Sequence, residues 1–442
     1  MCCSVEIPEE EGDIGTLRAK GEVHLPVRIL APPKQRAMRK LRDDFPILER
    51  TVGGKPAVYL DNACMALRPA GVIDAINGYY REYSGCHGRA QHAFGAATTA
   101  AFDDARRTVR DFLGAADASE ILFTRNTTEA INMVASGLAW KPGDAVISSD
   151  LEHNSNLLPW QGLAANHGVE HRIVPTRPDT RFDMAAFRQR LDSRVKLVSV
   201  LHTSNLTGVS FPIADIVHEA HKVGALVLVD AAQGMVGHDI DVRKLGVDLL
   251  AFSGHKALGP TGTGVLYARK DVQDRLSSRL LGGETVTDTT YTGHTLGPAP
   301  YRYEAGLQNY AGIIGLGAAC SYIDSVGQAR IAKRVRELNT MATEQLAKLD
   351  RVEILGPADP ALRSGLFTFR LRGIASSDVA WLLSTGANIM TRAGKHCVHA
   401  WYNARDEAPA VRASFAFYNS PEEVEFFCWT VKDILRSYPG TP

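Results

Sequence analysis

A lysine that enters a glycine-rich turn after an apolar run is the most reactive feature of the sequence. Lys256 follows Leu-Leu-Ala-Phe at residues 249–252 and precedes glycines at 259, 262 and 264. We expect its amine to emerge at a strand end in apolar surroundings. Desolvation lowers the pKa of a lysine, and an uncharged amine can attack an aldehyde to form a Schiff base. This chemistry indicates pyridoxal phosphate, although a lysine beside glycines is also typical of a solvated turn.

Other polar residues suit the same cofactor and follow other strands. Asp230 can pair with a pyridine nitrogen, Gln233 can bond the ring's phenolic oxygen, and the His153 imidazole can stack on the ring. The hydroxyl-rich turn around Thr127 and Thr128 can bind a phosphate, because unpaired amides and the helix dipole attract anions there. The ordinary alternatives are a helix N-cap at Thr127, a helix cap at Asp230 and a surface loop at His153.

The elements that must position these residues alternate between strand and helix. Apolar, β-rich runs occur at residues 57–60, 121–123, 145–148, 195–201, 226–230 and 249–252, with helical stretches such as 213–223 between them. The alternation predicts an α/β fold with a mostly parallel, doubly wound sheet. Such sheets bind ligands beyond the carboxyl ends of their strands, where Thr127, His153, Asn205, Asp230 and Lys256 all fall.

Changes in composition along the chain predict its domains. Residues 1–38 are rich in charge and proline without sustained periodicity, which indicates an N-terminal extension. We expect residues 59–323 to form a large cofactor-binding domain. After residue 323 a charged helix and short strands predict a smaller α+β domain over 324–442, to which residues 39–58 contribute.

Composition narrows the possible partners of this 442-residue chain. Its 49 basic and 49 acidic residues balance, so charge gives no reason to expect nucleic acid or an anionic membrane as a partner. The seven cysteines are odd in number and widely spread, which argues against a disulfide framework. The first residues lack the pattern of a signal peptide, and the most apolar run, 310–323, is too short to span a bilayer. We therefore expect a cytoplasmic protein with a small-molecule substrate.

Seven local motifs together resemble a known enzyme family. They are Tyr59-Leu60-Asp61-Asn62-Ala63, Asn126-Thr127-Thr128-Glu129, Glu152-His153-Asn154-Ser155-Asn156, Ser204-Asn205, Val229-Asp230-Ala231-Ala232-Gln233, Ser253-Gly254-His255-Lys256, and Arg392-x-Gly394-x-His396-Cys397. Over roughly residues 40–437 the chain resembles fold-type I pyridoxal phosphate enzymes of the class V aminotransferase superfamily, specifically the SufS-like cysteine desulfurases and selenocysteine lyases. The resemblance implies a seven-stranded sheet in the large domain, a homodimer and a link to iron-sulfur cluster assembly.

The resemblance also implies roles for individual residues. Lys256 would hold the cofactor covalently while His153 stacks on its ring. The other cofactor-binding residues would be Thr127, Thr128, Asp230, Gln233, Ser253 and His255. The substrate-binding residues would be Ala63, Asn205, Arg392 and Arg412, of which Arg412 would grip the substrate carboxylate.

Cys397 would decide the reaction. By the same resemblance it attacks the sulfur of L-cysteine, keeps that sulfur as a persulfide and leaves L-alanine, and an acceptor protein then takes the sulfur. Arg392, Lys395 and His396 form a basic neighbourhood that can favour a thiolate. The alternatives are a structural cysteine, selenocysteine lyase or C–S lyase activity on another cysteine derivative, and a sulfur-relay or scaffold role that uses Cys2 and Cys3. We expect no metal site at residues 396–399, because adjacent ligands cannot easily close one tetrahedral site.

The sequence departs from the family pattern around the substrate mouth. Leu307 stands where a threonine commonly reaches the phosphate of the partner subunit, and Gly88 stands where a histidine is common. The segment 398–402, Val-His-Ala-Trp-Tyr, is also atypical. These departures put the contact between subunits and the choice of substrate in doubt, and leave the cofactor residues intact.

Overall fold

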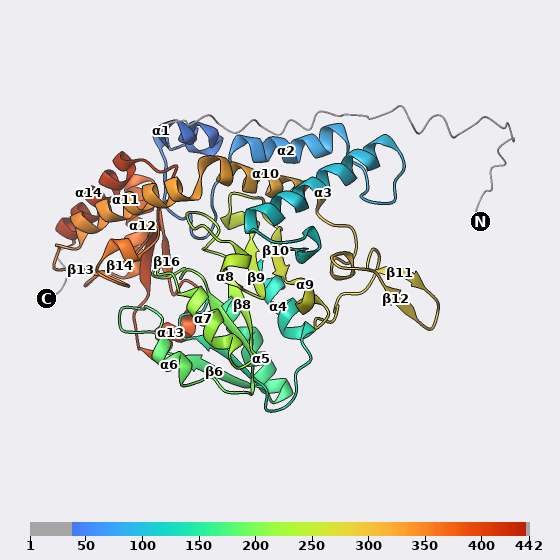
Figure 1. The fold of residues 1–442 in the computed structure, drawn as a ribbon. Coiled ribbons are helices and arrows are strands. Elements are labelled where there is room, and N and C mark those ends of the chain that lie inside the picture. Colours follow the sequence, from blue (N-terminus) through green and yellow to red (C-terminus); the bar gives the residue numbers. More distant parts are fainter. Residues whose placement is uncertain (1–37, 439–442) are drawn as a thin grey trace.

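The computed structural model describes residues 38–438 and is built around a seven-stranded sheet (Figure 1). In spatial order its strands are β4 (Ile121–Thr124), β10 (Gly264–Ala268), β9 (Leu249–Ser253), β8 (Leu226–Asp230), β7 (Val195–Leu201), β5 (Ala145–Ser149) and β6 (Glu170–Val174). β10 runs antiparallel to both of its neighbours, and the other neighbours are parallel. The prediction of an α/β fold with a mostly parallel sheet is confirmed.

Helices cover both faces of this sheet. On one face, α2 (Ala70–Glu82), α3 (Ala93–Leu113) and α10 (Tyr310–Val326) pack together, along the top of Figure 1. On the other face lie α4 (Thr127–Gly137) and α5 (Leu158–His167). The side chains of β9 alternate between the two cores: Leu250 and Phe252 face the first, and Leu249 and Ala251 the second. Burial on both faces explains why this strand is continuously apolar.

A second, antiparallel sheet lies beside the first, near the C-terminal end of the chain (Figure 1). Its order is β13 (Val352–Ile354), β14 (Leu366–Leu371), β17 (Ala410–Ser414) and β16 (Arg392–Gly394). The apolar residues of α11 (Gln328–Leu346), α12 (Ser376–Ala387) and α14 (Pro421–Ser437) form one core with this sheet.

The segment before the large sheet crosses to this second unit. β3 (Val58–Tyr59) pairs in parallel with β15 (Ile389–Met390), and Val58 and Leu60 are buried in the C-terminal core. Phe45 packs against Tyr322, Phe417 and Tyr418, and so contacts both parts. The predicted boundaries at residues 59 and 324 stay predictions. The predicted N-terminal extension, with Cys2 and Cys3, lies outside the described residues except for Met38.

The remaining elements are short. They include α1 (Met38–Leu41), α6 (Met184–Arg188), α7 (Ile213–His221), α8 (Val242–Leu245), α9 (Lys270–Gln273), α13 (His399–Ala404) and the strands β1 (Thr51–Val52) and β2 (Lys55–Pro56). β11 (Val286–Thr289) and β12 (His294–Leu296) form a hairpin that projects from the body in Figure 1. Between residues 38 and 438, no helix has the length and apolar character needed to cross a membrane.

Candidate active site

Strand register brings the predicted residues to one edge of the large sheet. Leu201 of β7 is level with Asp230 of β8, which is level with Ala251 of β9. Since the carboxyl ends of parallel strands meet at one edge, the segments that follow them are neighbours. Lys256 ends the single 3-10 turn η6 (Gly254–Lys256), directly after β9. Burial lowers the pKa of its amine, nearby Arg412 lowers it further, and Asp230 acts in the opposite direction.

Asp230 is a buried carboxylate without a basic partner. It is 5% exposed, and its Oδ1 accepts a hydrogen bond from the amide of Ala232 at 2.9 Å. No ion pair joins it to any arginine, lysine or histidine in the described part of the chain within 4.0 Å. Burial raises the pKa of this carboxyl group. A protonated pyridine nitrogen is the kind of group that would compensate such a buried charge.

His153 and Gln233 are each held by a hydrogen bond to the backbone. His153 caps the 3-10 turn η5 (Asn154–Asn156), and its Nδ1 accepts from the amide of Ser155 at 3.1 Å. Burial lowers the pKa of His153 to about 4, helped by the charges of Lys256 and Arg412, so its imidazole is neutral at pH 7. Gln233 Nε2 donates to the carbonyl of Ala63 at 2.6 Å.

Hydroxyl groups gather at the N-terminus of α4. Thr127 is buried, and its amide donates to Ser253 Oγ at 2.8 Å, while its own hydroxyl lies 2.7 Å from the same oxygen. Thr128 is exposed and lies 2.8 Å from Ser155 Oγ. The helix cap is Asn126, whose side chain accepts from the amide of Glu129 at 2.9 Å, so Thr127 is not the N-cap.

Glycine permits this helix end to approach the sheet. A Cβ atom on Gly264 of β10 would come within 2.7 Å of the Asn126 backbone. His255 follows Ser253 by two residues and is half-buried. Burial lowers the pKa of His255 to about 4, with help from Lys256 and Arg68. Hydroxyls, amides and the dipole of an eleven-residue helix make an anion site of the kind that holds a phosphate.

Two arginines face the other end of the site and share one aspartate. Arg392 donates from Nη2 to Asp61 Oδ2 at 2.9 Å and from Nε to both carboxylate oxygens at 3.2 Å. Arg412, which is 3% exposed, donates from Nη1 to the carbonyl of Asn205 at 2.8 Å and lies 3.6 Å from Asp61 Oδ1. Its Nε has no hydrogen-bond partner among the described residues. A planar guanidinium with a free donor suits a carboxylate ligand.

Cys397 lies on a strained loop at the surface of this site. It is exposed, and both His396 and Cys397 have positive φ angles, 48° and 59°. Non-glycine residues avoid this conformation unless their surroundings hold them in it. Asn205 Nδ2 donates to the carbonyl of His396 at 2.7 Å, and the amide of Asn154 donates to the carbonyl of Cys397 at 2.8 Å. These two hydrogen bonds hold the loop against the segments that follow β5 and β7, next to His153.

Two residues of this arrangement were missed by the sequence analysis as site residues. Asp61 holds both arginines, and Cys64 Sγ lies 2.8 Å from Arg392 Nη2. Both follow β3 in the stretch Tyr59-Leu60-Asp61-Asn62-Ala63-Cys64, so the position after a strand was the available signal. Both backbone groups of Ala63 are hydrogen-bonded. Its carbonyl accepts from Gln233, and its amide donates to Ser414 Oγ at 2.9 Å.

The two histidines beside Cys397 have separate partners. His396 Nε2 lies 3.1 Å from the carbonyl of Ala410, and His399 Nδ1 lies 3.0 Å from Asn154 Nδ2. Among residues 38–438, no group of three or more histidine, cysteine, aspartate or glutamate side chains is placed to hold a metal ion.

Comparison with known proteins identifies the family that this geometry belongs to. A family model described as aminotransferase class-V matches residues 58–427. The chain belongs to this family. Within it, a relative from Haloferax volcanii named cysteine desulfurase is 37% identical over 403 residues, which cover 87% of this chain and 94% of the relative.

Two solved structures extend the likeness to the three-dimensional fold. The apo structure of a cysteine desulfurase from Thermococcus onnurineus is 35% identical with a TM-score of 0.87, covering 92% of this chain and 100% of that chain. The cysteine desulfurase CsdA from Escherichia coli, in an S-sulfonic acid form, is 34% identical with a TM-score of 0.84, covering 91% and 100%. The predicted class V resemblance is confirmed.

The residues at the sheet edge fit pyridoxal phosphate, the cofactor that membership of the class-V family indicates. The site offers an amine with a lowered pKa, a buried carboxylate without a cation, a neutral imidazole and a hydroxyl-lined helix N-terminus. Each matches one chemical feature of that cofactor: aldehyde, pyridine nitrogen, ring face and phosphate.

Proposed function

We propose that this protein is a pyridoxal phosphate-dependent cysteine desulfurase, which converts L-cysteine to L-alanine and carries the sulfur on Cys397. The observation that carries the proposal is the exposed Cys397 thiol on a strained loop. That loop is hydrogen-bonded to Asn154, next to His153, and to Asn205, whose carbonyl also accepts from Arg412. The relatives that match most of this chain are named cysteine desulfurases, which supports the same activity.

When bound, the cofactor supplies an aldehyde that condenses with amines and a ring system that accepts electrons. Lys256 Nζ would hold the aldehyde carbon, and Asp230 would keep the pyridine nitrogen protonated. Thr128, Ser253 and His255 would hold the phosphate, with Thr127 supporting Ser253, and Gln233 would bond the phenolic oxygen. The Lys256 amine would also serve as the base for the substrate's α-proton, because burial lowers its pKa and so favours the uncharged form.

Arg412 would bind the substrate carboxylate through the donor that its protein contacts leave free. Arg392, Asn205 and the backbone of Ala63 would surround the same substrate. In this arrangement the Cys397 thiolate attacks the sulfur of the bound cysteine. A sulfur–sulfur bond forms as the Cβ–sulfur bond breaks, and the electron pair of that bond stays with the carbon skeleton. Protonation then releases alanine and leaves a persulfide on Cys397.

The test is to incubate the purified holoenzyme with L-cysteine and measure alanine and sulfide together. Cys397→Ala should lose alanine formation while retaining the bound cofactor. Cys428→Ala is the matched control, because that thiol is buried in the C-terminal core away from the site and should leave turnover intact. Unchanged turnover in Cys397→Ala would refute the sulfur-acceptor role.

The same assay separates cysteine desulfurase from its nearest alternatives. L-selenocysteine and another cysteine derivative, cysteine sulfinate, are offered beside L-cysteine. A chain that releases alanine from L-cysteine only weakly, and from one of the others efficiently, acts on that compound instead. Elimination of selenide can proceed without Cys397, so activity that survives in Cys397→Ala with selenocysteine alone would assign a selenocysteine lyase.

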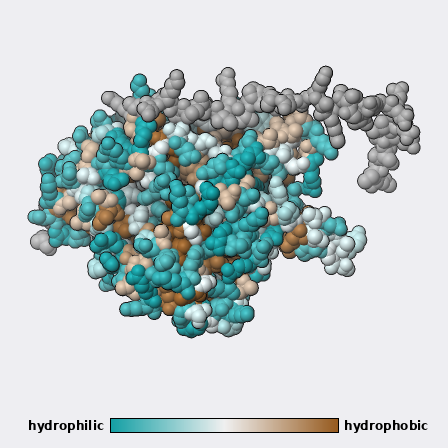
Figure 2. Space-filling view, in the orientation of Figure 1, coloured by the Kyte–Doolittle hydropathy of each residue, from teal (hydrophilic) through white to brown (hydrophobic). Residues whose placement is uncertain are grey.

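We propose further that the enzyme is a homodimer and passes its sulfur to an acceptor protein. The projecting β11–β12 hairpin and the loops beside it expose large apolar side chains: Leu280, Leu281, Tyr291, Leu296 and Leu307. This hairpin is largely of intermediate hydropathy in Figure 2. A subunit interface would cover such side chains. Light scattering on the purified protein tests the dimer, and a monomer that keeps full activity would contradict it.

A further inference from the structure

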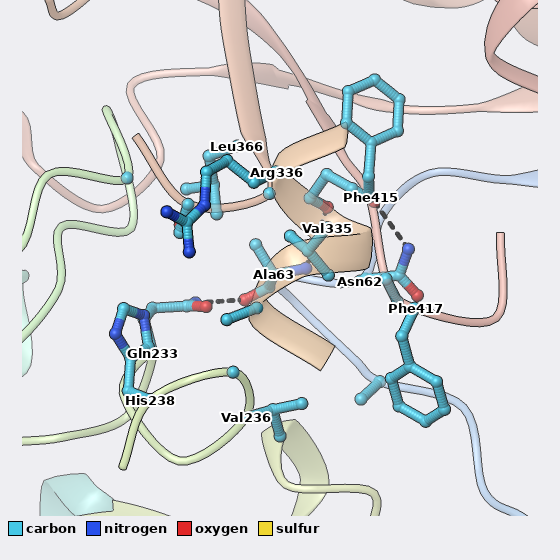
Figure 3. A pocket seen from close by; sticks show the side chains of 18 of the residues that line it. Asn62, Ala63, Gln233, Val236, His238, Val335, Arg336, Leu366, Phe415 and Phe417 are labelled. Atoms are coloured by element: carbon cyan, nitrogen blue, oxygen red, sulfur yellow. Dashed lines mark hydrogen bonds between the residues drawn. The ribbon is translucent and has the colours of Figure 1, made fainter. Parts of the chain in front are cut away.

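A cavity of about 370 Å³ lies behind the cofactor site, between the large sheet and the C-terminal unit (Figure 3). It meets the cofactor site at Lys256, Ala63 and Gln233, and the hydrogen bond from Gln233 to Ala63 forms part of the shared wall. This volume falls in the range of small-molecule sites. Arg412, the predicted carboxylate ligand of the substrate, does not belong to its lining.

One wall of the cavity contains a buried arginine, Arg363, which lies over the ring of Phe367 and has no carboxylate in ion-pair range among the described residues. Arg363 is 2% exposed, and its Nη2 donates to Thr343 Oγ1 at 2.6 Å. Its Nε and Nη1 make no hydrogen bond with any residue that the structure describes. Within residues 38–438 no carboxylate lies within 4.0 Å of it. Asp359 acts on it only electrostatically, since that side chain caps a short helical turn instead. Burying an unpaired cation is costly unless an anion compensates it.

The rest of the lining is cationic or polar on one side and apolar on the other. Figure 3 shows Arg336 and His238 on one side, opposite Phe415 and Phe417, with Val335 between them. Arg336 makes no hydrogen bond or ion pair with the described residues. Burial and Arg336 lower the pKa of His238 to about 4, so its imidazole is neutral at pH 7 and can share a hydrogen bond with an anion. None of the described residues that line the cavity is an aspartate or glutamate.

We infer that this cavity is a second ligand site, which binds a small organic anion with an apolar body. Arg363 and Arg336 bind the anionic group, and the phenylalanine side contacts the apolar part. Two guanidinium groups without protein carboxylates select a carboxylate or another oxyanion. The apolar wall selects an organic anion over an inorganic one. Because Gln233 and Ala63 belong to both sites, an occupant can change how the cofactor is held.

Calorimetric titration of the holoenzyme with benzoate tests the inference without using activity. Benzamide, the neutral analogue, and inorganic sulfate are titrated in parallel. We expect saturable benzoate binding. Benzamide lacks the negative charge and sulfate lacks the apolar body, so each should bind at least about tenfold more weakly. Equal binding of benzoate and benzamide, or of benzoate and sulfate, would contradict the assigned ligand class.

Variants locate the binding. Arg336→Gln and Arg363→Gln should each weaken benzoate binding by about tenfold, because each removes a charge-assisted contact. Arg336 is exposed, so its variant should fold even if the Arg363 variant does not. Lys333→Gln makes the same charge change on α11 at an exposed residue outside the cavity and should bind normally.

Arg412→Gln should retain benzoate binding, because Arg412 lies outside the cavity lining. Binding that is lost with Arg412→Gln and kept in Arg336→Gln would place the anion at the substrate site and overturn the inference. Absence of saturable binding to the wild type at millimolar benzoate would overturn it as well. These outcomes are independent of whether L-cysteine is the substrate.

Discussion

The loop that carries Cys397 should depend on one buried side chain, Asn205. Two consecutive non-glycine residues with positive φ cost about 1–2 kcal/mol each. The hydrogen bond from Asn205 to the carbonyl of His396 opposes that cost. Asn205→Ala removes the donor and leaves a buried carbonyl unsatisfied, a loss of about 1–3 kcal/mol. Such a loss increases the population of a relaxed loop by about 5- to 150-fold.

Hydrogen–deuterium exchange measures this effect directly. The amide of Asn154 bonds to the carbonyl of Cys397, and the amide of Val398 bonds to Lys395, so both report on the loop. Both amides should exchange about 5- to 150-fold faster in Asn205→Ala, and the desulfuration rate should fall.

The matched control for this loop is Asn154→Ala. It removes an exposed side chain that contacts His399 and keeps the backbone amide that bonds to Cys397, so we expect little change. Equal exchange at the Val398 amide in wild type, Asn205→Ala and Asn154→Ala would refute the claim that Asn205 holds the loop.

Three further substitutions test other parts of the account. Glu304→Gln should destabilise the fold by about 3–5 kcal/mol in urea unfolding, because it leaves Arg106 charged and buried without the bidentate partner at 2.7 and 2.8 Å; an unchanged midpoint would contradict this. Burial raises the pKa of Glu152 from 4.5 to about 8. Between these two pH values the folded chain keeps the carboxyl proton and the unfolded chain releases it. The free energy of unfolding of the wild type should therefore fall as pH rises from 4.5 toward 8, by at most about 1.4 kcal/mol per pH unit. Glu152→Gln should flatten that slope in thermal unfolding, and parallel slopes would show that another group causes it. Lys256→Ala should abolish both alanine formation and the visible absorbance of lysine-bound cofactor, and an unaltered spectrum would mean that another amine holds it.

The sequence predicted the large sheet well because its strands are buried on both faces. Continuous apolar runs such as 226–230 and 249–252 leave little choice of structure, and the position after each strand then located Asp230 and Lys256. The strands β6 and β10 were not among the predicted runs, and the run 57–60 contributes β3, which pairs with β15 outside the large sheet. The reversed direction of β10 could not be predicted either, because strand direction depends on the connections and not on the apolar pattern. In the C-terminal sheet, β13 and β16 have three residues each, too few for a clear apolar pattern.

Contacts between distant segments were the part of the site that the sequence could not supply. Asp61 precedes Arg392 by 331 positions, and no local pattern shows that it meets both Arg392 and Arg412. Asn205 was predicted to lie beside the substrate, and the structure shows that its side chain bonds to His396. The positive φ angles of His396 and Cys397 could not be predicted either, because that conformation is usually signalled by glycine or asparagine. The cavity behind Gln233 is lined by segments far apart in the sequence, from Asn62 to Tyr418, so no local pattern could indicate it.

The central claim is that Cys397 takes the sulfur of the substrate. The most direct measurement is peptide mass spectrometry after one equivalent of L-cysteine is mixed with the holoenzyme and free thiols are blocked. We expect the peptide containing Cys397 to gain the mass of one sulfur atom, in proportion to the alanine formed. Alanine formation with no sulfur on Cys397, or with sulfur on Cys64 instead, would contradict it.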